Sequence, residues 1–355
     1  MKILMISNMY PSKSDSTYGI FVKNFQEQLE KLGVSFELAV IEGRGSSKLY
    51  KIGKYLKFFK DVIKSIMKND YDLIYVHYIN HSLIPLIFTK KYINKPLVLH
   101  AHGSDVFTES KLSSYVQKFT KRIIKQADLI VVPSLYFKKV VIDKFGVNNI
   151  YIFPSGGVNT KLFKPLNLKR NKIFTIGFVS RIDKGKGWDI FLKSLYILRQ
   201  NAIKFNAIVV GDGKEKKDFL KLIDELKLND NIVYYGAVPH NKLPEIFNLM
   251  DIFVFPTIRK AESLGLVGLE AMACGIPVIG SRIGGLLEYI KDEYNGKLFT
   301  PGNVLELVRA IRWYINLSKN KKLKLKRNAL ETAKKFDSEK VFKNLYVFLK
   351  ERFSL

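Results

Sequence analysis

The chain has 355 residues, 47% of them hydrophobic and 26% charged, a balance that excludes a disordered protein and leaves room for two domains. Lysine and arginine number 59 against 32 acidic residues, and the resulting formal charge of +27 favours a polyanionic partner: nucleic acid, an anionic membrane or a phosphorylated substrate. Background composition explains the charge equally well. The basic residues are spread over both halves of the chain, and we therefore expect no nucleic-acid partner.

Cysteine usage and hydropathy indicate the compartment. The single cysteine, Cys274, excludes a disulfide within the chain and fits a reducing environment. The apolar run that begins at Met1 is too short for a signal peptide, and no stretch of about 18 apolar residues occurs. We expect a cytoplasmic protein, with a peripheral position on the inner face of the cell membrane as an alternative.

Short apolar runs alternate with amphipathic stretches in the first half of the chain. The expected strands are Ile3–Ile6, Phe36–Ile41, Leu73–His77, Leu97–His100, Leu129–Val132 and Ile150–Phe153. The expected helices include Phe21–Lys31, Leu49–Lys68, Leu112–Lys125 and Tyr136–Phe145. Because the strands are almost entirely apolar, this alternation predicts a parallel sheet with helices on both faces.

The alternation stops between Pro154 and Lys172 and then starts again. The second set of expected strands is Phe174–Val179, Phe205–Val210, Ile232–Tyr235, Ile252–Phe255 and Pro277–Gly280. We therefore expect an α/β protein with two Rossmann-like, doubly wound domains, residues 1–165 and 166–337, joined by a linker near 160–171 and facing each other across a cleft. A helix over about 338–355 is the candidate to pack back on the first domain.

The segment from Glu262 to Glu270 carries the strongest chemical signal. It follows an apolar strand and opens a helix, whose N-terminal N–H groups suit a diphosphate. Gly265 and Gly268 allow the backbone to approach a ligand closely. At about 1.5 Å per residue the two carboxylates stand about 12 Å apart, the reach from a transferring sugar to the ribose of a nucleotide. On spacing alone, a capping glutamate and a surface glutamate explain the segment equally well.

This segment resembles the Glu-x7-Glu motif of retaining glycosyltransferases with the GT-B fold, in particular those of family 4. The stretch from Ser180 to Gly187 is similar to the G-R-x4-K-G segment of that family, with Ser180 in place of the first glycine. In the family the arginine and lysine bind the donor diphosphate, which the resemblance carries over to Arg181 and Lys186. Two cations on a loop that follows a strand can neutralise a leaving diphosphate.

Other segments resemble the family in the same order along nearly the whole chain. The turn at Gly211, in Val209–Gly213, is similar to the G-D-G turn near the nucleotide, and the turn that ends at Val238 resembles the one that meets the base. The stretch Pro154–Asn159 resembles the interdomain P-N-G-V-D segment, from which it departs at three positions.

In the first half, the stretch from Leu99 to Asp105 resembles the H-G-x-D segment of the family, with His102 as the matching histidine. The family places that histidine against the donor sugar and phosphates. Gly19 is the counterpart of a glycine turn after the first strand. The nearby His100 raises a metal site as an alternative, but we expect it to point to the opposite side of the strand, and no Cys or His cluster is suggested by the pattern.

The resemblance implies a retaining hexosyltransferase. The donor is a nucleotide-diphosphate sugar, with UDP-sugars as the first candidates and GDP-mannose as the second, and the acceptor is a hydroxyl of a sugar, lipid-linked or polysaccharide and glycoconjugate molecule. The implied roles are leaving-group stabilisation by Arg181, Lys186 and the backbone of Gly265, Leu266 and Val267, sugar binding by Glu262, ribose binding by Glu270, and contact of His102 with the sugar. Neither a metal nor a cofactor is expected. A phosphorylase or epimerase of the same architecture, or a non-catalytic nucleotide-sugar-binding protein, are the alternatives.

One expected helix carries two stripes. Its lysines, Lys48, Lys51, Lys54, Lys57, Lys60, Lys64 and Lys68, recur every three or four residues, and Ile52, Leu56, Phe59, Ile63 and Ile66 form another face. In one interpretation, the helix covers the sheet and its lysines face water. In the other, the surface Lys48–Lys68 meets anionic lipid, to which each lysine contributes about 1 kcal/mol. Family 4 enzymes often act on lipid-linked acceptors at the inner membrane face, which the resemblance adds to the second interpretation.

Overall fold

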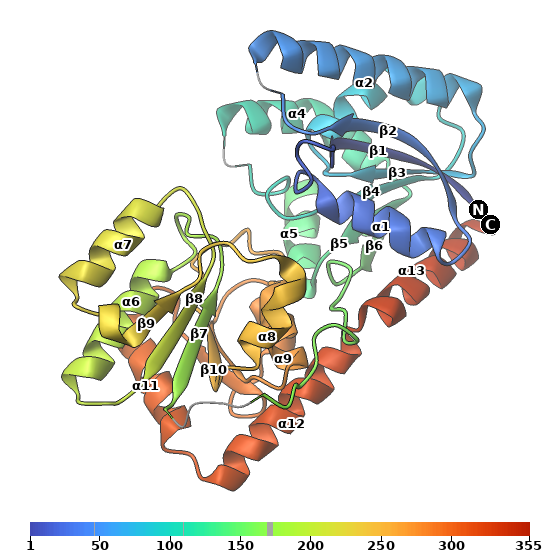
Figure 1. Cartoon of the computed structure of the whole chain (residues 1–355). Helices are drawn as coiled ribbons and strands as arrows, with labels where there is room; N and C mark the ends of the chain where they lie inside the picture. Colours follow the sequence, from blue (N-terminus) through green and yellow to red (C-terminus); the bar gives the residue numbers. More distant parts are fainter. Residues whose placement is uncertain (46, 109, 169–172) are drawn as a thin grey trace. The chain divides into compact units, whose positions relative to one another are not determined.

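The computed structural model describes residues 1–45, 47–108, 110–168 and 173–355 (Figure 1). The chain forms two compact units, residues 1–156 with 339–355, and residues 157–338. The division falls between Gly156 and Gly157, before the linker expected near 160–171, because Val158 pairs with the backbone around Asp337 in the second unit. Within that expected linker, residues 169–171 lie outside the described part of the chain.

The first unit is built on a six-stranded parallel sheet in the order β2-β1-β3-β4-β5-β6. Its strands are β1 (Lys2–Tyr10), β2 (Ser35–Glu42), β3 (Leu73–His77), β4 (Leu97–His100), β5 (Leu129–Val132) and β6 (Ile150–Ile152). The strands β3, β4 and β5 are buried along their whole length, as expected of a sheet covered on both faces.

Two layers of helices cover this sheet (Figure 1). One layer holds α2 (Lys48–Lys68), η1 (His81–Leu83), α3 (Ile84–Thr89), η2 (Lys90–Tyr92), α4 (Lys111–Lys125) and α5 (Leu135–Phe145). The other holds α1 (Ile20–Glu30) and α13 (Ser338–Phe353). The last helix of the chain thus belongs to the core of the first unit, where Phe342 contacts Phe25 and Phe153.

The second unit has a six-stranded parallel sheet in the order β12-β11-β10-β7-β8-β9. Its strands are β7 (Thr175–Val179), β8 (Asn206–Val210), β9 (Ile232–Tyr234), β10 (Ile252–Phe255), β11 (Val278–Ser281) and β12 (Gly296–Phe299). Its helices are α6 (Trp188–Gln200), α7 (Lys216–Glu225), η3 (Asn229–Asn231), η4 (His240–Lys242), α8 (Leu243–Phe247), α9 (Leu266–Ala273), α10 (Leu286–Tyr289), α11 (Val304–Ile315) and α12 (Lys319–Lys335).

This strand order reverses direction between β7 and β10, the first and fourth strands of the unit. In open parallel sheets, ligands bind beyond the carboxyl ends of the strands at such a switch point, because the helices that follow the two strands leave in opposite directions. The loop after β7 begins at Ser180 and the loop after β10 begins at Pro256. The topology therefore brings the two chemically most informative segments of the sequence to one crevice.

The structure corrects the expected faces of α2. The side chains that reach the core are Phe58, Val62 and Ile66, whereas most of the expected apolar stripe is exposed. Exposed members of that stripe and its continuation are Leu49, Ile52, Leu56, Ile63 and Met67. The helix therefore has a buried apolar face and a second apolar face turned to solvent.

Candidate active site

A lysine and a glutamate form a charge pair at the switch point of the second unit. Nζ of Lys186, in the loop after β7, donates to Oε2 of Glu262, in the loop after β10, at 2.7 Å. The side chains are only 14% and 12% exposed, so solvent screens the pair weakly. The hydroxyl of Thr257 lies 3.3 Å from the same carboxylate oxygen. One oxygen of Glu262 is thus engaged inside the protein.

Helix α9 begins directly after these residues and is anchored by a tyrosine. The hydroxyl of Tyr289 donates to the backbone oxygen of Gly265 at 2.9 Å. A Cβ on Gly268 would lie 2.2 Å from that hydroxyl, so this glycine makes room for Tyr289. Packing against Tyr289 is thus a structural reason for this glycine, and the expected approach of a ligand to the backbone at Gly268 stays a prediction. The amides of Leu266 and Val267, in the first turn, have no intrahelical partner available to them.

The second carboxylate of the motif has a partner that the sequence analysis missed. Oε1 of Glu270 lies 2.8 Å from Nε2 of His240, in η4. The glutamate side chain is mostly buried, and this hydrogen bond raises the pKa of His240 above its usual value. The only available signal was the position of His240, two residues beyond the Val238 turn.

Lys186, Glu262, Glu270 and the start of α9 line one pocket of about 500 Å³. Every donor-site residue expected in the second half of the chain borders it: Arg181, Lys186, Gly211, Val238, Glu262, Gly265, Leu266, Val267 and Glu270. Arg181 reaches out to Asp183, with Nη1 and Oδ2 2.9 Å apart, and its side chain is 67% exposed. The pocket combines cationic, anionic and apolar walls, as small-molecule sites do.

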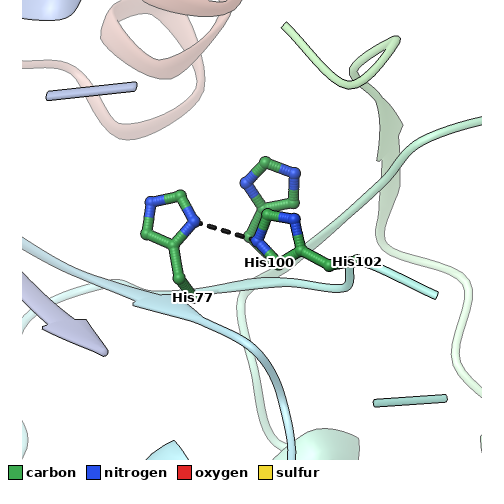
Figure 2. Close-up of side chains that lie close together, drawn as sticks. All are labelled: His77, His100 and His102. Atoms are coloured by element: carbon green, nitrogen blue, oxygen red, sulfur yellow. Dashed lines mark hydrogen bonds between the residues drawn. The ribbon is translucent and has the colours of Figure 1, made fainter. Parts of the chain in front are cut away.

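The first unit holds three histidines close together at the carboxyl ends of β3 and β4 (Figure 2). His77 and His100 end neighbouring strands and are paired in register. Nδ1 of His77 and Nε2 of His102 are 3.0 Å apart, at hydrogen-bond distance. The rings of His100 and His102 stack at 4.2 Å between centroids, and Nδ1 of His100 lies 3.1 Å from the hydroxyl of Tyr75.

This arrangement overturns the expectation for His100. Side chains two positions apart on a strand lie on the same face, so His100, the last residue of β4, and His102 would share a side even if the strand continued. The expected absence of a histidine cluster is also wrong, because ring nitrogens of His77, His100 and His102 lie within 4.8 Å of one another.

A buried aspartate fixes the loop that carries His102. The carboxylate of Asp105 accepts backbone N–H groups from His102 at 2.9 Å, Gly103 at 2.8 Å and Ile79 at 2.8 Å. Burial raises the pKa of Asp105 to about 6, although these donors oppose the rise. The loop after β4 is therefore tied to the end of β3 by a single side chain.

Burial keeps the histidine cluster neutral. It lowers the pKa of His77 and His100 well below the usual range, with a smaller contribution from repulsion by neighbouring histidines, and it lowers the pKa of His102 to about 3. At neutral pH each ring then carries one proton, and its position depends on the hydrogen bonds of the ring.

Gly19 lies in the same unit, before α1. Its φ is +71°, and a Cβ there would lie 2.5 Å from the carbonyl carbon of Met9. The close approach of two backbone segments therefore explains this glycine. The adjoining helix places Phe21 against the ring of His102, at 4.4 Å between centroids.

Models of two known protein families match the sequence, one in each unit. Residues 159–334 match the family described as glycosyl transferases group 1, and residues 21–161 match glycosyltransferase family 4.

Several relatives resemble the chain in sequence. A protein of the cps region of Klebsiella pneumoniae is 30% identical over 261 residues, which cover 70% of each chain. A glycosyltransferase of Methanocaldococcus jannaschii is 28% identical over 353 residues, covering 96% of this chain and 95% of the relative. A GDP-mannose-dependent phosphatidylinositol monomannoside mannosyltransferase of Mycolicibacterium smegmatis is 26% identical over 229 residues, 61% and 59% of the two chains.

Solved structures share the fold over its full length. The sucrose-phosphate synthase of Thermosynechococcus elongatus has a TM-score of 0.82 at 20% identity, covering 100% of this chain and 99% of the other. The Anabaena protein HepE in complex with UDP has a TM-score of 0.77 at 21% identity, with 99% and 100% covered, and it was also solved with UDP-glucose. The expected GT-B fold is confirmed. The chain belongs to the group 1 glycosyltransferases of family 4.

Proposed function

We propose that the chain is a retaining hexosyltransferase whose second unit binds a nucleotide-diphosphate sugar. The observation that carries this proposal is the weakly screened pair of Lys186 and Glu262 at the start of α9. A mostly buried lysine suits a diphosphate, and a carboxylate with one oxygen already engaged has its other oxygen available for sugar hydroxyls. Both groups border the same pocket as Glu270.

The donor extends along α9 in this proposal. The diphosphate lies against Lys186, the first-turn amides of α9 and the exposed end of Arg181, while Glu270 accepts hydrogen bonds from the ribose hydroxyls through its second oxygen. UDP-sugars are the proposed donors because the HepE complexes contain UDP and UDP-glucose. GDP-mannose is the second candidate, since the mycolicibacterial relative depends on it.

The proposed chemistry proceeds with retention at the anomeric carbon. The bond from that carbon to the diphosphate oxygen breaks, and the acceptor oxygen forms its bond on the same face. The acceptor proton passes to the leaving diphosphate, whose negative charge Lys186 and Arg181 stabilise. Because cationic side chains and a helix N-terminus supply this stabilisation, the proposed reaction is metal-independent.

A ligand panel and product analysis test this function. Thermal unfolding is followed with UDP, GDP, ADP and their sugars, and a ligand at a hundredfold excess over its Kd stabilises by about 2.7 kcal/mol. We expect UDP and UDP-sugars to stabilise most, and we expect the transferred sugar to keep its anomeric configuration by NMR. Inverted product would refute the retaining mechanism, and stabilisation by none of the nucleotides would refute the donor site.

The acceptor side of the proposal rests on the first unit. A pocket of about 1030 Å³ lies between β2 and α2, where apolar side chains such as Val40 and Leu49 line it together with Arg44, Lys54 and Lys57. Apolar walls with cationic groups suit an acyl chain that carries a phosphate or diphosphate. A lipid-linked acceptor is therefore the preferred one.

The surface that is proposed to bind a membrane includes helices α3 and α4 as well as the lysine-rich helix α2. Helix α3 packs against both α2 and α4, and all three expose large apolar side chains. The exposed groups beyond α2 are Ile87, Phe88 and Tyr92 around α3 and Leu112, Tyr115 and Phe119 on α4. We define this set, with the exposed apolar and lysine side chains of α2, as the three-helix face. Lysines beside apolar anchors fit an anionic bilayer. No helix in the described residues is long and apolar enough to cross a membrane.

Lysine substitution tests this surface. Replacing the exposed residues Lys51, Lys57, Lys60 and Lys64 by Gln is expected to reduce binding to anionic vesicles at least tenfold, because each lysine contributes about 1 kcal/mol near such a surface. The matched control replaces four exposed lysines of α12 by Gln: Lys319, Lys321, Lys324 and Lys335. Equal vesicle binding by the two variants would refute the proposed surface.

A further inference from the structure

One nitrogen of His102 is already in use inside the protein. Its Nε2 lies 3.0 Å from Nδ1 of His77, and both rings are desolvated and neutral (Figure 2). Two neutral imidazoles at this distance share a single proton between the facing nitrogens, so one ring donates and the other accepts. The two possible directions of this hydrogen bond give His102 opposite tautomers.

We propose that His77 is a positioning residue for sugar transfer, which donates from Nδ1 to Nε2 of His102 and thereby fixes His102 as the tautomer with its proton on Nδ1. This inference rests on the proposed function and on the role that the family resemblance implies for His102, contact with the sugar. His102 then presents an N–H group, rather than a lone pair, on the side of its ring away from His77. It donates a hydrogen bond to a sugar oxygen and does not act as a base.

The other nitrogen of His77 sets the direction of the bond. Nε2 of His77 is buried and has no hydrogen-bond partner among the described residues. If His77 accepted from His102, this Nε2 would carry an orphaned N–H, facing surroundings that include the ring of Phe25 at 4.6 Å between centroids. Buried N–H groups without an acceptor are rarer than buried acceptors without a donor. This difference favours the direction in which Nδ1 of His77 carries the proton and donates it to His102.

The neighbouring side chains hold this pair in place. Phe21 and Phe25, both on α1, contact the rings of His102 and His77. Asp105 fixes the backbone at His102, so the ring cannot move away with its loop. Because both rings are restrained in this way, the direction of their hydrogen bond decides whether His102 turns an N–H group or a lone pair toward a ligand.

A metal ion is the competing explanation for three clustered histidines. The rings of His77 and His102 are within 25° of parallel, as are those of His100 and His102, so their in-plane lone pairs run in similar planes instead of converging on one point. The nearby carboxylate of Asp105 is occupied by three backbone N–H groups and does not face an ion. The hydrogen-bonded pair explains the 3.0 Å distance without a metal.

Histidine NMR on the full-length protein reads the tautomer directly. The chain has five histidines, so 15N-labelled imidazoles can be assigned by comparison with single variants. Two-bond 1H–15N correlations are expected to show His102 protonated on Nδ1 and His77 protonated on Nδ1. A proton on Nε2 of His102 overturns the proposal. Shifts of the His77 and His102 signals with one equivalent of Zn²⁺ at micromolar concentration would also overturn it, in favour of a metal site.

Two variants of His77 test the consequence for catalysis. His77→Phe keeps the ring and removes the donor, while His77→Asn places an amide N–H near the position of Nδ1. We expect kcat to fall about 100-fold in His77→Phe, with the KM for the sugar donor within threefold of wild type, and to recover at least tenfold in His77→Asn. Wild-type kcat in His77→Phe, or equal losses in both variants, overturns the positioning role.

Failure of this inference and failure of the proposed function are distinguishable. Far-UV circular dichroism and stabilisation by UDP check the fold and the pocket of the second unit in each variant. If the wild-type protein transfers no sugar, the proposed function fails while the NMR measurement still decides the tautomer. If wild type transfers sugar and His77→Phe does so equally well, only the inference on His77 fails.

Discussion

At the scale of single residues, the proposed donor pocket contains a charge pair whose two side chains are both mostly buried. Lys186 and Glu262 come from loops after two different strands. Each provides the counter-charge of the other in a poorly solvated position. Such a pair is pre-organised, because both groups are already desolvated and restrained before a ligand arrives. This is the arrangement in which an electrostatic contact contributes most to a transition state.

Removing either member should therefore affect chemistry more than folding. Lys186→Ala and Glu262→Gln are each expected to lower kcat for sugar transfer about 100-fold or more, since in the proposed reaction Lys186 contacts the leaving diphosphate and Glu262 contacts the sugar. Lys193→Ala is the matched control, because Lys193 forms an exposed helical pair with Asp189 on the following helix. Turnover at the wild-type rate in either pocket variant, measured with saturating donor, would contradict the assigned roles.

His240 offers a second test at this scale. Its hydrogen bond to Glu270 holds one oxygen of the carboxylate that is proposed to bind the ribose, so His240→Ala is expected to raise the Kd for UDP about tenfold. Because the pKa of His240 is raised in the native state, the bond is strongest below the ordinary value of 6.5 and is lost as the pH rises through the higher native value. UDP affinity measured by calorimetry should decline over that range in wild type and stay level in His240→Ala.

The residues that sequence could predict are those that lie on short motifs. Glu262, Lys186 and Arg181 stand at fixed spacings after predictable strands, and the structure brings them to one pocket. Tyr289 and His77 gave no such signal, because their partners come from elsewhere in the chain. Their roles depend on tertiary contacts that no local pattern contains.

At the scale of elements, three buried or partly buried histidines gather at the carboxyl ends of β3 and β4. The pKa values of His77, His100 and His102 lie below 6.5, so the unfolded chain takes up protons below that pH while the native state does not. Stability is therefore fully present above about pH 6.5 and falls as the pH drops, by about 1.4 kcal/mol per pH unit for each neutral histidine. Asp105 opposes this between about pH 6 and 4, because its native pKa of about 6 exceeds the unfolded value.

Hydrogen exchange can isolate this effect in the full-length protein. Urea unfolding of the first unit, followed by pulse labelling of β3 and β4, should give a free energy of unfolding that declines from pH 7 to pH 5. In His77→Phe the decline should be shallower by about 1.4 kcal/mol per pH unit, because one titrating group is gone. A pH-independent free energy in wild type would show that these histidines bind the same number of protons in the native and unfolded states, which contradicts the lowering of their pKa by burial.

Alanine substitutions at two helical glycines are expected to have opposite effects on the stability of the protein. Gly268→Ala in α9 would place a methyl group 2.2 Å from the hydroxyl of Tyr289, and we expect a loss of about 1–3 kcal/mol in stability together with weaker UDP binding. Gly53→Ala in α2 meets nothing within 4 Å and should gain about 0.5–1 kcal/mol. Thermal unfolding of both variants, with and without UDP, checks the contrast. A stabilised Gly268→Ala variant would contradict the packing described for Tyr289.

The bounds of most strands and helices could be predicted from the sequence, but the face that a helix buries could not. Strands such as β3, β4 and β10 have the expected bounds, because buried parallel strands are continuous apolar runs. The short β12, with sequence Gly-Lys-Leu-Phe, lacks such a run and escaped prediction. In α2 the periodicity predicts a helix, but two apolar faces lie side by side on it. Only the tertiary fold determines that the face with Phe58 and Val62 is buried.

At the scale of the whole molecule, two parallel sheets follow from the repeated alternation of strands and helices, but their strand orders do not. The order in the second unit places its reversal between β7 and β10, and this reversal turns two separate motifs into one pocket. The family match covers both units and fixes the class of reaction. The identity of donor and acceptor depends on side chains that differ within one fold.

The net charge of +27 belongs to the whole molecule, and the three-helix face gives it a specific consequence. If lysines alone held the protein to an anionic vesicle, binding would disappear at 0.5 M salt, since the Debye length falls to about 4 Å. Apolar anchors are insensitive to salt, so we expect a reduced but measurable fraction bound in co-sedimentation at that concentration. The double variant Leu56→Ser and Phe88→Ser should lose this residual binding and keep most of its binding at low salt, because both side chains are exposed and contribute by insertion. Complete release of wild type by salt would mean that the exposed apolar side chains do not enter the bilayer.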